Sequence, residues 1–222
     1  MSEFSILLLI LTVLFAYLIG AIPFGLIVAR LFGIKDIRKL GSGNIGATNV
    51  WRNAGAKAAV WVFIGDIGKG ILAVLIAKSV YKNYMVTEIQ LELFIAICGI
   101  VAVLGHMFPV YLKFKGGKGV NTTLGVIATL LPLQTLMCFG VFTVILIITR
   151  YVSLASIIAV LALIAILLIQ KFVLSQSVSF TYLIMALAMA FFVIIAHRQN
   201  IARIIAGTEN KFRFSAGTSG IK

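Results

Sequence analysis

Acidic residues, cysteine and histidine are scarce in this chain, and each shortage excludes a class of protein. Only 6 Asp and Glu accompany 19 Lys and Arg, so the formal net charge is +13 over 222 residues. The two cysteines, Cys98 and Cys138, lie inside apolar runs, and we expect them to pack in the interior instead of forming a disulfide. The two histidines, His106 and His197, are too far apart for metal-ligand spacing. The sequence therefore predicts no metal site and no cofactor.

Long polar stretches are also few, because 62% of the residues are hydrophobic and the mean hydropathy is +1.15. Soluble domains are about half apolar. Alternating ten-residue patterns are absent, which argues against a membrane β-barrel. No repeat or long linker divides the chain. We therefore predict an all-α, polytopic integral membrane helical bundle that forms one domain over residues 1–222.

The positive charge points to the membrane as a partner. On a membrane protein it indicates cytoplasmic loops and contact with anionic membrane lipid. No soluble basic domain is present to bind nucleic acid, so we expect no nucleic-acid partner. The first apolar run is long and is preceded by Glu3 instead of a cationic region, so we expect an uncleaved span.

Seven apolar runs predict about seven transmembrane helices, at about 4–29, 58–77, 91–112, 120–131, 133–149, 152–169 and 178–196. Three basic segments remain, at 30–57, 113–119 and 197–222. If Pro132 marks an outer turn, these segments and Arg150 share one side of the membrane. The positive-inside rule then places the N-terminus outside and the C-terminus in the cytoplasm.

The fourth predicted span is the weak point of this topology. Twelve residues of helix cover about 18 Å, whereas the hydrocarbon core is roughly 30 Å thick. We expect this helix to be tilted, extended back into the preceding loop, or partly re-entrant.

The segment 41–52 is small and polar between apolar neighbours. Its glycines allow backbone N–H groups to approach a ligand, and successive N–H groups can form an anion-binding concavity. Arg52 adds a planar fork of donors suited to phosphate or carboxylate. This segment is therefore a candidate anion site.

A second glycine-rich loop, 113–119, runs into the helix expected at Val120. A helix N-terminus favours an anion, and Lys118 supplies a positive charge beside it. The spacing is not that of a P-loop. The alternative interpretation is a positive-inside anchor that binds lipid headgroups.

The tail places His197, Asn200 and Arg203 on a neighbouring strip if the last span continues as a helix. A polar cap at the membrane interface is the alternative. Ser153 could cap its helix or contact a ligand.

Two charges, Asp66 and Lys69, lie within a span. We expect them to pair with each other or with another span, and a proton or ion pathway is the alternative. We expect His106 to be a buried, hydrogen-bonded structural histidine.

Together these segments resemble the bacterial acyl-phosphate:glycerol-3-phosphate acyltransferase family of membrane proteins. The resemblance rests on Gly-Ser-Gly-Asn-Ile-Gly-Ala-Thr-Asn-Val-Trp-Arg at 41–52, on Gly-His-Met-Phe-Pro-Val-Tyr-Leu-Lys-Phe-Lys-Gly-Gly-Lys-Gly-Val at 105–120, and on His-Arg-Gln-Asn-Ile-Ala-Arg with Gly-Thr-Glu within 197–209. It covers nearly the whole chain in the right order.

The resemblance implies transfer of a fatty acyl group from acyl phosphate to the 1-position of glycerol 3-phosphate, giving lysophosphatidic acid and inorganic phosphate. It also implies seven spans, the bacterial inner membrane, a cytoplasmic active site, and a partner enzyme that supplies acyl phosphate. The implied catalytic residues are Ser42, His197 and Asn200. The expected substrate- and phosphate-binding residues are Gly41, Gly43, Asn44, Arg52, Gly116, Gly117, Lys118, Gly119 and Ser153.

The residues suit this chemistry. Acyl phosphate already has a good leaving group, so the enzyme mainly positions the glycerol hydroxyl and stabilises charge. We expect Arg52, Lys118 and His197 chiefly to bind phosphate, and Ser42 with the Gly41–Gly43 backbone to hold the donor phosphate or the developing oxyanion. The general base is left unassigned, with His197 and a substrate phosphate oxygen as the candidates.

Two other functions compete with this prediction. A transporter or flippase for a phosphorylated or anionic solute would suit the short fourth span and Asp66. A noncatalytic lipid-binding scaffold would use the same cations without a reaction. Polar residues gather at one end of the spans, which favours an enzyme at the membrane interface.

Overall fold

The structure is a computed structural model that describes residues 3–84 and 89–212. Its elements are α1 (Glu3–Ala21), α2 (Phe24–Leu31), η1 (Ile37–Lys39), α3 (Ala47–Asn83), α4 (Leu91–Met107), η2 (Val110–Leu112), α5 (Val120–Leu130), α6 (Pro132–Thr149), α7 (Val152–Leu168), η3 (Ile169–Val173), α8 (Phe180–Ala196) and α9 (Arg198–Ile205). Every regular element in the described ranges is helical, which confirms the all-α fold. Residues 213–222 of the predicted basic tail lie outside the described residues.

The first predicted span is broken near its end. α1 stops at Ala21 and α2 begins at Phe24, because Pro23 lacks the N–H that would continue the helix. The two helices still form one apolar segment of 29 residues, Glu3–Leu31.

α3 begins about ten residues earlier than the sequence indicated. We placed the second span at 58–77, but the helix starts at Ala47 and bends at Gly55, whose φ of 84° and ψ of 177° are not helical. Residues 47–54 therefore form about two helical turns that carry Arg52, and apolarity alone did not predict them.

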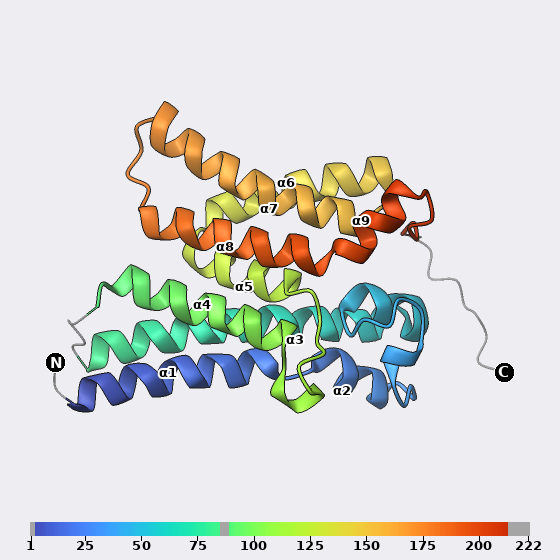
Figure 1. Ribbon diagram of the computed structural model, residues 1–222, viewed down its shortest axis with the longest axis horizontal. Coiled ribbons are helices and arrows are strands. Elements are labelled where there is room, and N and C mark those ends of the chain that lie inside the picture. The colour runs from blue at the N-terminus through green and yellow to red at the C-terminus, as the bar shows by residue number, and fades with distance from the viewer. Residues whose placement is uncertain (1–2, 85–88, 213–222) are drawn as a thin grey trace.

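The helices pack as two groups with α5 between them. Figure 1 shows α1–α4 on one side and α6–α9 on the other. Glycines allow close contact within the first group and with α5, since Cβ atoms at Gly20 and Gly125 would overlap the backbones of Ala102 and Ile67. Such small-residue contacts are typical of packing between membrane helices.

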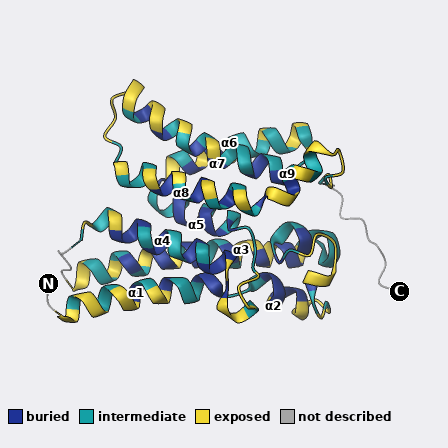
Figure 2. Cartoon of the chain, in the orientation of Figure 1, coloured by how far each residue is buried: buried dark blue, intermediate teal, exposed yellow. Residues whose placement is uncertain are grey.

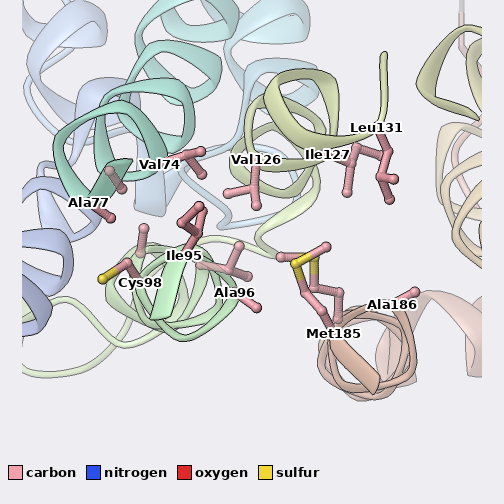
Figure 3. Close-up of a cluster of buried hydrophobic side chains, with 14 of the residues drawn as sticks. Val74, Ala77, Ile95, Ala96, Cys98, Val126, Ile127, Leu131, Met185 and Ala186 are labelled. Atoms are coloured by element: carbon pink, nitrogen blue, oxygen red, sulfur yellow. The ribbon is translucent and has the colours of Figure 1, made fainter. Parts of the chain in front are cut away.

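The hydrophobic core lies where α3, α4, α5 and α8 meet. Figure 3 shows Val74, Ile95, Val126 and Met185 directed into this core. Both cysteines are buried and free, as predicted. Large apolar side chains are exposed on the outward helix faces, for example along α1 and α6 (Figure 2). These faces suit a lipid environment.

Within residues 3–84 and 89–212, five helical segments are long and apolar enough to cross a membrane, and α8 together with α9, bent by 59°, makes a sixth candidate. α5 has only 11 residues. It is thus as short as expected. A polytopic membrane bundle is confirmed, while the count of seven spans and their orientation stay predictions.

Candidate functional site

A cavity of about 350 Å³ connects the polar segments with the apolar interior. Its polar wall comes from the loop before α3, the first turns of α3, the start of α5 and the junction of α8 with α9. Its apolar wall comes from α3, α5, α6 and α7. The polar lining includes Ser42, Asn44, Thr48, Asn49, Arg52, Lys118, Ser153, His197, Asn200, Arg203 and Glu209, and the apolar lining includes Phe63, Leu124, Ile127, Cys138, Phe139, Phe142, Leu146 and Val160.

The loop before α3 is organised by Asn49, which our site prediction did not include. Its buried Nδ2 donates to the carbonyls of Ile37, Leu40 and Asn44, at 3.3, 3.0 and 2.8 Å. Its Oδ1 accepts from the backbone N–H of Ser42 at 3.0 Å. One side chain thus fixes the loop that presents Ser42 and Asn44 to the cavity.

Most glycines of both loops shape the backbone and do not line the cavity; Gly46 and Gly119 are the ones that do. Gly41 and Gly43 have φ of +56° and +71°, in the left-handed region that favours glycine. The N–H groups of Ser42 and Gly43 already donate within the loop, to Asn49 and Leu40. Those of Gly116 and Gly117 donate to the carbonyls of Met107 and His106. Side chains, not these N–H groups, are therefore available for an anion.

Glu209 is the central acceptor of the tail, and it was also missed. Its carboxylate accepts from Ser153 Oγ at 2.8 Å, Asn200 Nδ2 at 2.6 Å and Arg203 Nε at 2.7 Å. Burial raises the pKa of Glu209, but these hydrogen bonds outweigh burial and hold the pKa below its usual value. As the lone acid of the described tail, within Gly207-Thr-Glu209, it could have been suspected from the sequence.

Lys118 projects across the cavity from the start of α5. Its Nζ donates to Asn200 Oδ1 at 2.5 Å and so links the loop before α5 to α9. Burial lowers the pKa of Lys118 to about 8, and Glu209 opposes that shift. The ammonium is thus charged at neutral pH but poorly solvated, which suits it to bind an anion.

Arg52 faces the same space from α3 and contacts the tail. Its Nη2 donates to the carbonyl of Asn210 at 3.1 Å. The neighbouring Trp51 packs on Phe212 with ring centroids 5.4 Å apart. The tail therefore crosses from α9 to α3 at the edge of the cavity, since Asn210 and Phe212 also line it.

His197 lies between α8 and α9 and is almost fully buried. Its Nδ1 is 2.7 Å from the carbonyl of Val193, which can only accept, so Nδ1 carries the proton. Burial, reinforced by Lys118, lowers its pKa to about 4. A neutral imidazole with Nδ1–H presents Nε2 as an acceptor. This favours contact with a hydroxyl over the phosphate-binding role that we expected.

Eight predicted site residues meet in the cavity: Ser42, Asn44, Arg52, Lys118, Gly119, Ser153, His197 and Asn200. Gly41, Gly43, Gly116 and Gly117 lie behind it. The charges of α3 pair with each other as expected, since Lys69 Nζ is 2.9 Å from Asp66 Oδ1. Asp66 and His106 also line the cavity. Within the described ranges, no group of three His, Cys, Asp or Glu side chains could hold a metal.

Fold and site together define an integral membrane protein with a cavity that is cationic at one end and apolar along one wall. Residues 10–207 match the family model described as glycerol-3-phosphate acyltransferase. The chain therefore belongs to the glycerol-3-phosphate acyltransferase family.

Relatives and solved structures agree with this family. Glycerol-3-phosphate acyltransferase 2 of Bacillus anthracis is 45% identical over 91% of this chain and 98% of its own length. A glycerol-3-phosphate acyltransferase of Macrococcus caseolyticus is 43% identical over 92% of this chain and 97% of its own.

The fold is similar to crystal structures of the integral membrane glycerol 3-phosphate acyltransferase PlsY (YgiH). Its glycerol 3-phosphate form has a TM-score of 0.80 and 40% identity, covering 92% of this chain and 96% of that chain. Its lysophosphatidic acid form has a TM-score of 0.79 and 39% identity, covering 92% and 95%. The chain is thus a glycerol-3-phosphate acyltransferase of the PlsY type, an enzyme of phospholipid synthesis that produces lysophosphatidic acid.

Proposed function

We propose that the acyl donor is acyl phosphate and that the acyl group goes to the 1-position of glycerol 3-phosphate, with release of inorganic phosphate. The observation that carries this is the division of one cavity into a cationic end and an apolar wall. Both substrates carry phosphate, and only the donor carries a long chain. A single cavity of this kind accommodates both.

Arg52 and Lys118 are the cations best placed to hold the two phosphates. Each lines the cavity, and among the described residues neither has a direct carboxylate contact, whereas Arg203 is held by Glu209 at 2.7 Å. Phosphate would replace the Asn210 carbonyl and the Asn200 amide oxygen as their acceptors. Charged acceptors make the stronger hydrogen bonds, which favours the exchange.

In the proposed reaction the 1-hydroxyl oxygen attacks the acyl carbon. The bond from this oxygen to the carbonyl carbon forms, and the bond from that carbon to the phosphate oxygen breaks. The hydroxyl proton passes to His197 Nε2 or to a phosphate oxygen. Phosphate is a good leaving group, so positioning and charge stabilisation supply most of the rate.

The apolar wall reaches the surface that faces lipid. Phe63 on α3 and Phe139 on α6 line the cavity yet are 39% and 51% exposed. This supports entry of the acyl chain from the bilayer between these helices. We further propose that the polar end faces the cytoplasm, where the basic segments are expected.

The experiment compares donors. Purified protein in lipid vesicles would receive glycerol 3-phosphate with either palmitoyl phosphate or palmitoyl-CoA. We expect 1-acyl lysophosphatidic acid only from palmitoyl phosphate, with one phosphate released per product. Product from palmitoyl-CoA and none from palmitoyl phosphate would refute the proposed donor.

A further inference from the structure

The interior holds an ionic cluster of Asp66, Lys69 and His106, all at most 4% exposed. Lys69 Nζ lies 2.9 Å from Asp66 Oδ1, 2.6 Å from His106 Nδ1 and 3.2 Å from the carbonyl of Ile22. His106 Nδ1 is also 3.4 Å from Asp66 Oδ1. The cluster thus joins α3, α4 and the break between α1 and α2.

The donors and acceptors of this cluster are matched. An ammonium group offers three donors and no acceptor. Its three neighbours are a carboxylate, a ring nitrogen and a carbonyl, so Nδ1 of His106 accepts and the ring of a neutral His106 carries its proton on Nε2. The imidazole therefore has one orientation, set by Lys69.

His106 also contacts the glycine-rich loop that precedes α5, through its backbone carbonyl and through its ring. The carbonyls of His106 and Met107 accept from the N–H groups of Gly117 and Gly116, at 3.0 and 3.1 Å. The ring tip lies against Gly117, where an added Cβ would overlap Nε2. The residue after Gly117 is Lys118, whose ammonium enters the cavity.

We propose that His106, oriented by Lys69 and Asp66, is a positioning residue that fixes the position of the Lys118 ammonium group in the cavity. This rests on the proposed role of Lys118 in binding substrate phosphate. Buried charges are expensive in a membrane, and well-packed apolar side chains would fill the same space at lower cost. What the cluster adds is a fixed direction for the imidazole and hence for the loop.

A double-mutant cycle between Gly117 and His106 tests this. Gly117→Ala adds a Cβ that collides with Nε2, so we expect the KM for glycerol 3-phosphate to rise about tenfold, within the usual range of coupled neighbours. His106→Asn keeps an acceptor near the Nδ1 position for Lys69 but removes the ring tip. Alone it should raise KM by only about threefold. Combined with Gly117→Ala it should lower the KM of that variant at least about threefold.

The readouts separate positioning from general damage. A purely structural role would reduce the folded fraction and the apparent kcat while KM stays constant, and the two substitutions would add. Additive or worse effects, or a normal KM in Gly117→Ala, would overturn the proposal. If Gly117→Ala fails to fold, recovery of folding in the double variant tests the same contact, and its absence overturns it.

Two controls complete the design. Gly140→Ala lies on α6, outside the cavity lining, with no atom within 4 Å of the added Cβ, and should leave KM unchanged. Lys118→Ala tests the underlying function independently. If Lys118→Ala keeps its KM, the proposed phosphate-binding role fails; if it loses binding while the cycle is additive, only the positioning role of His106 fails.

Discussion

At the scale of single residues, the site combines a neutral histidine with cations that are only partly solvated. His197 is held neutral by burial, and its Nδ1–H is used by Val193. Lys118 is charged at neutral pH with a pKa of about 8. In the proposed mechanism His197 is therefore a candidate proton acceptor, and Lys118 binds phosphate.

The titration of Lys118 predicts a pH dependence. Its pKa in the free enzyme is lowered to about 8, so the ammonium is present below that pH and is lost above it. We expect the KM for glycerol 3-phosphate to rise between about pH 8 and 9.5, because a neutral amine attracts phosphate less. kcat should change less, since bound phosphate raises the lysine pKa. Initial rates of lysophosphatidic acid formation at several pH values measure this.

Lys118→Arg is the matched control, because a guanidinium stays protonated throughout this range. This variant should be less active. Its KM for glycerol 3-phosphate should stay constant from about pH 7 to 9.5, a range that includes the Lys118 pKa of about 8. The same alkaline rise in KM in Lys118→Arg would assign the titration to another group.

Side chains that could bind or react with a substrate were predictable from the sequence. The residues that hold them in place by hydrogen bonds were not. Arg52, Lys118 and His197 stood out because cations and polar groups are rare among apolar runs. Asn49 and Glu209 were missed, because their importance lies in bonds to segments whose fold the sequence does not reveal. Of the predicted site glycines only Gly119 lines the cavity, and the anion-binding N–H groups expected at Ser42 and Gly43 are occupied within the loop.

At the scale of elements, the kink in α3 places the polar first turns relative to the long apolar part. Gly55 combines φ of 84° with ψ of 177°, a conformation open essentially to glycine. Hydropathy placed a boundary close to this point, at residue 57 or 58, but could not show that helix continues on both sides. A change from polar to apolar residues along the chain predicts where a helix enters the membrane, but not where the helix begins.

This kink gives a prediction with a control on the same helix. Gly55→Ala should destabilise the protein by about 1–3 kcal/mol and lower activity, because the strained backbone shifts the turn that carries Arg52. Thermal unfolding in detergent and the acyltransfer rate measure both effects.

Gly68→Ala is the control, since it lies in regular helix with no atom within 4 Å of the added Cβ. It should leave activity unchanged and stabilise the protein by up to about 1 kcal/mol. Equal effects of the two substitutions would show that the backbone angle at Gly55 is unimportant.

At the scale of the whole molecule, the cavity lies where the two helical groups of Figure 1 face each other. Lys118, in the loop before α5, bridges to Asn200 of α9, and Arg52 of α3 reaches the tail at Asn210. The apolar segments predicted the bundle, and the polar segments predicted one shared site; residues from all three polar segments do line the cavity. Their convergence depends on close helix contacts at glycines, which are long-range features.

The orientation in the membrane can be tested by cysteine labelling. Lys115 and Gln176 are exposed and lie at opposite ends of the predicted spans. In intact cells, a membrane-impermeant maleimide should label Gln176→Cys but not Lys115→Cys, which should react only after permeabilisation. The buried Cys98 and Cys138 should stay unreactive in both cases. The reverse pattern would place the site outside the cytoplasm.

The central claim is that one cavity, with Lys118 at its cationic end, carries out acyl transfer from acyl phosphate. The most direct measurement follows phosphate release and lysophosphatidic acid together, with palmitoyl phosphate and glycerol 3-phosphate, in wild type, Lys118→Ala and Lys115→Ala. We expect equal amounts of both products only when both substrates are present, a loss of at least about a hundredfold in Lys118→Ala, and normal activity in Lys115→Ala, whose side chain is exposed outside the cavity. Wild-type activity in Lys118→Ala, or phosphate release that ignores glycerol 3-phosphate, would contradict the claim.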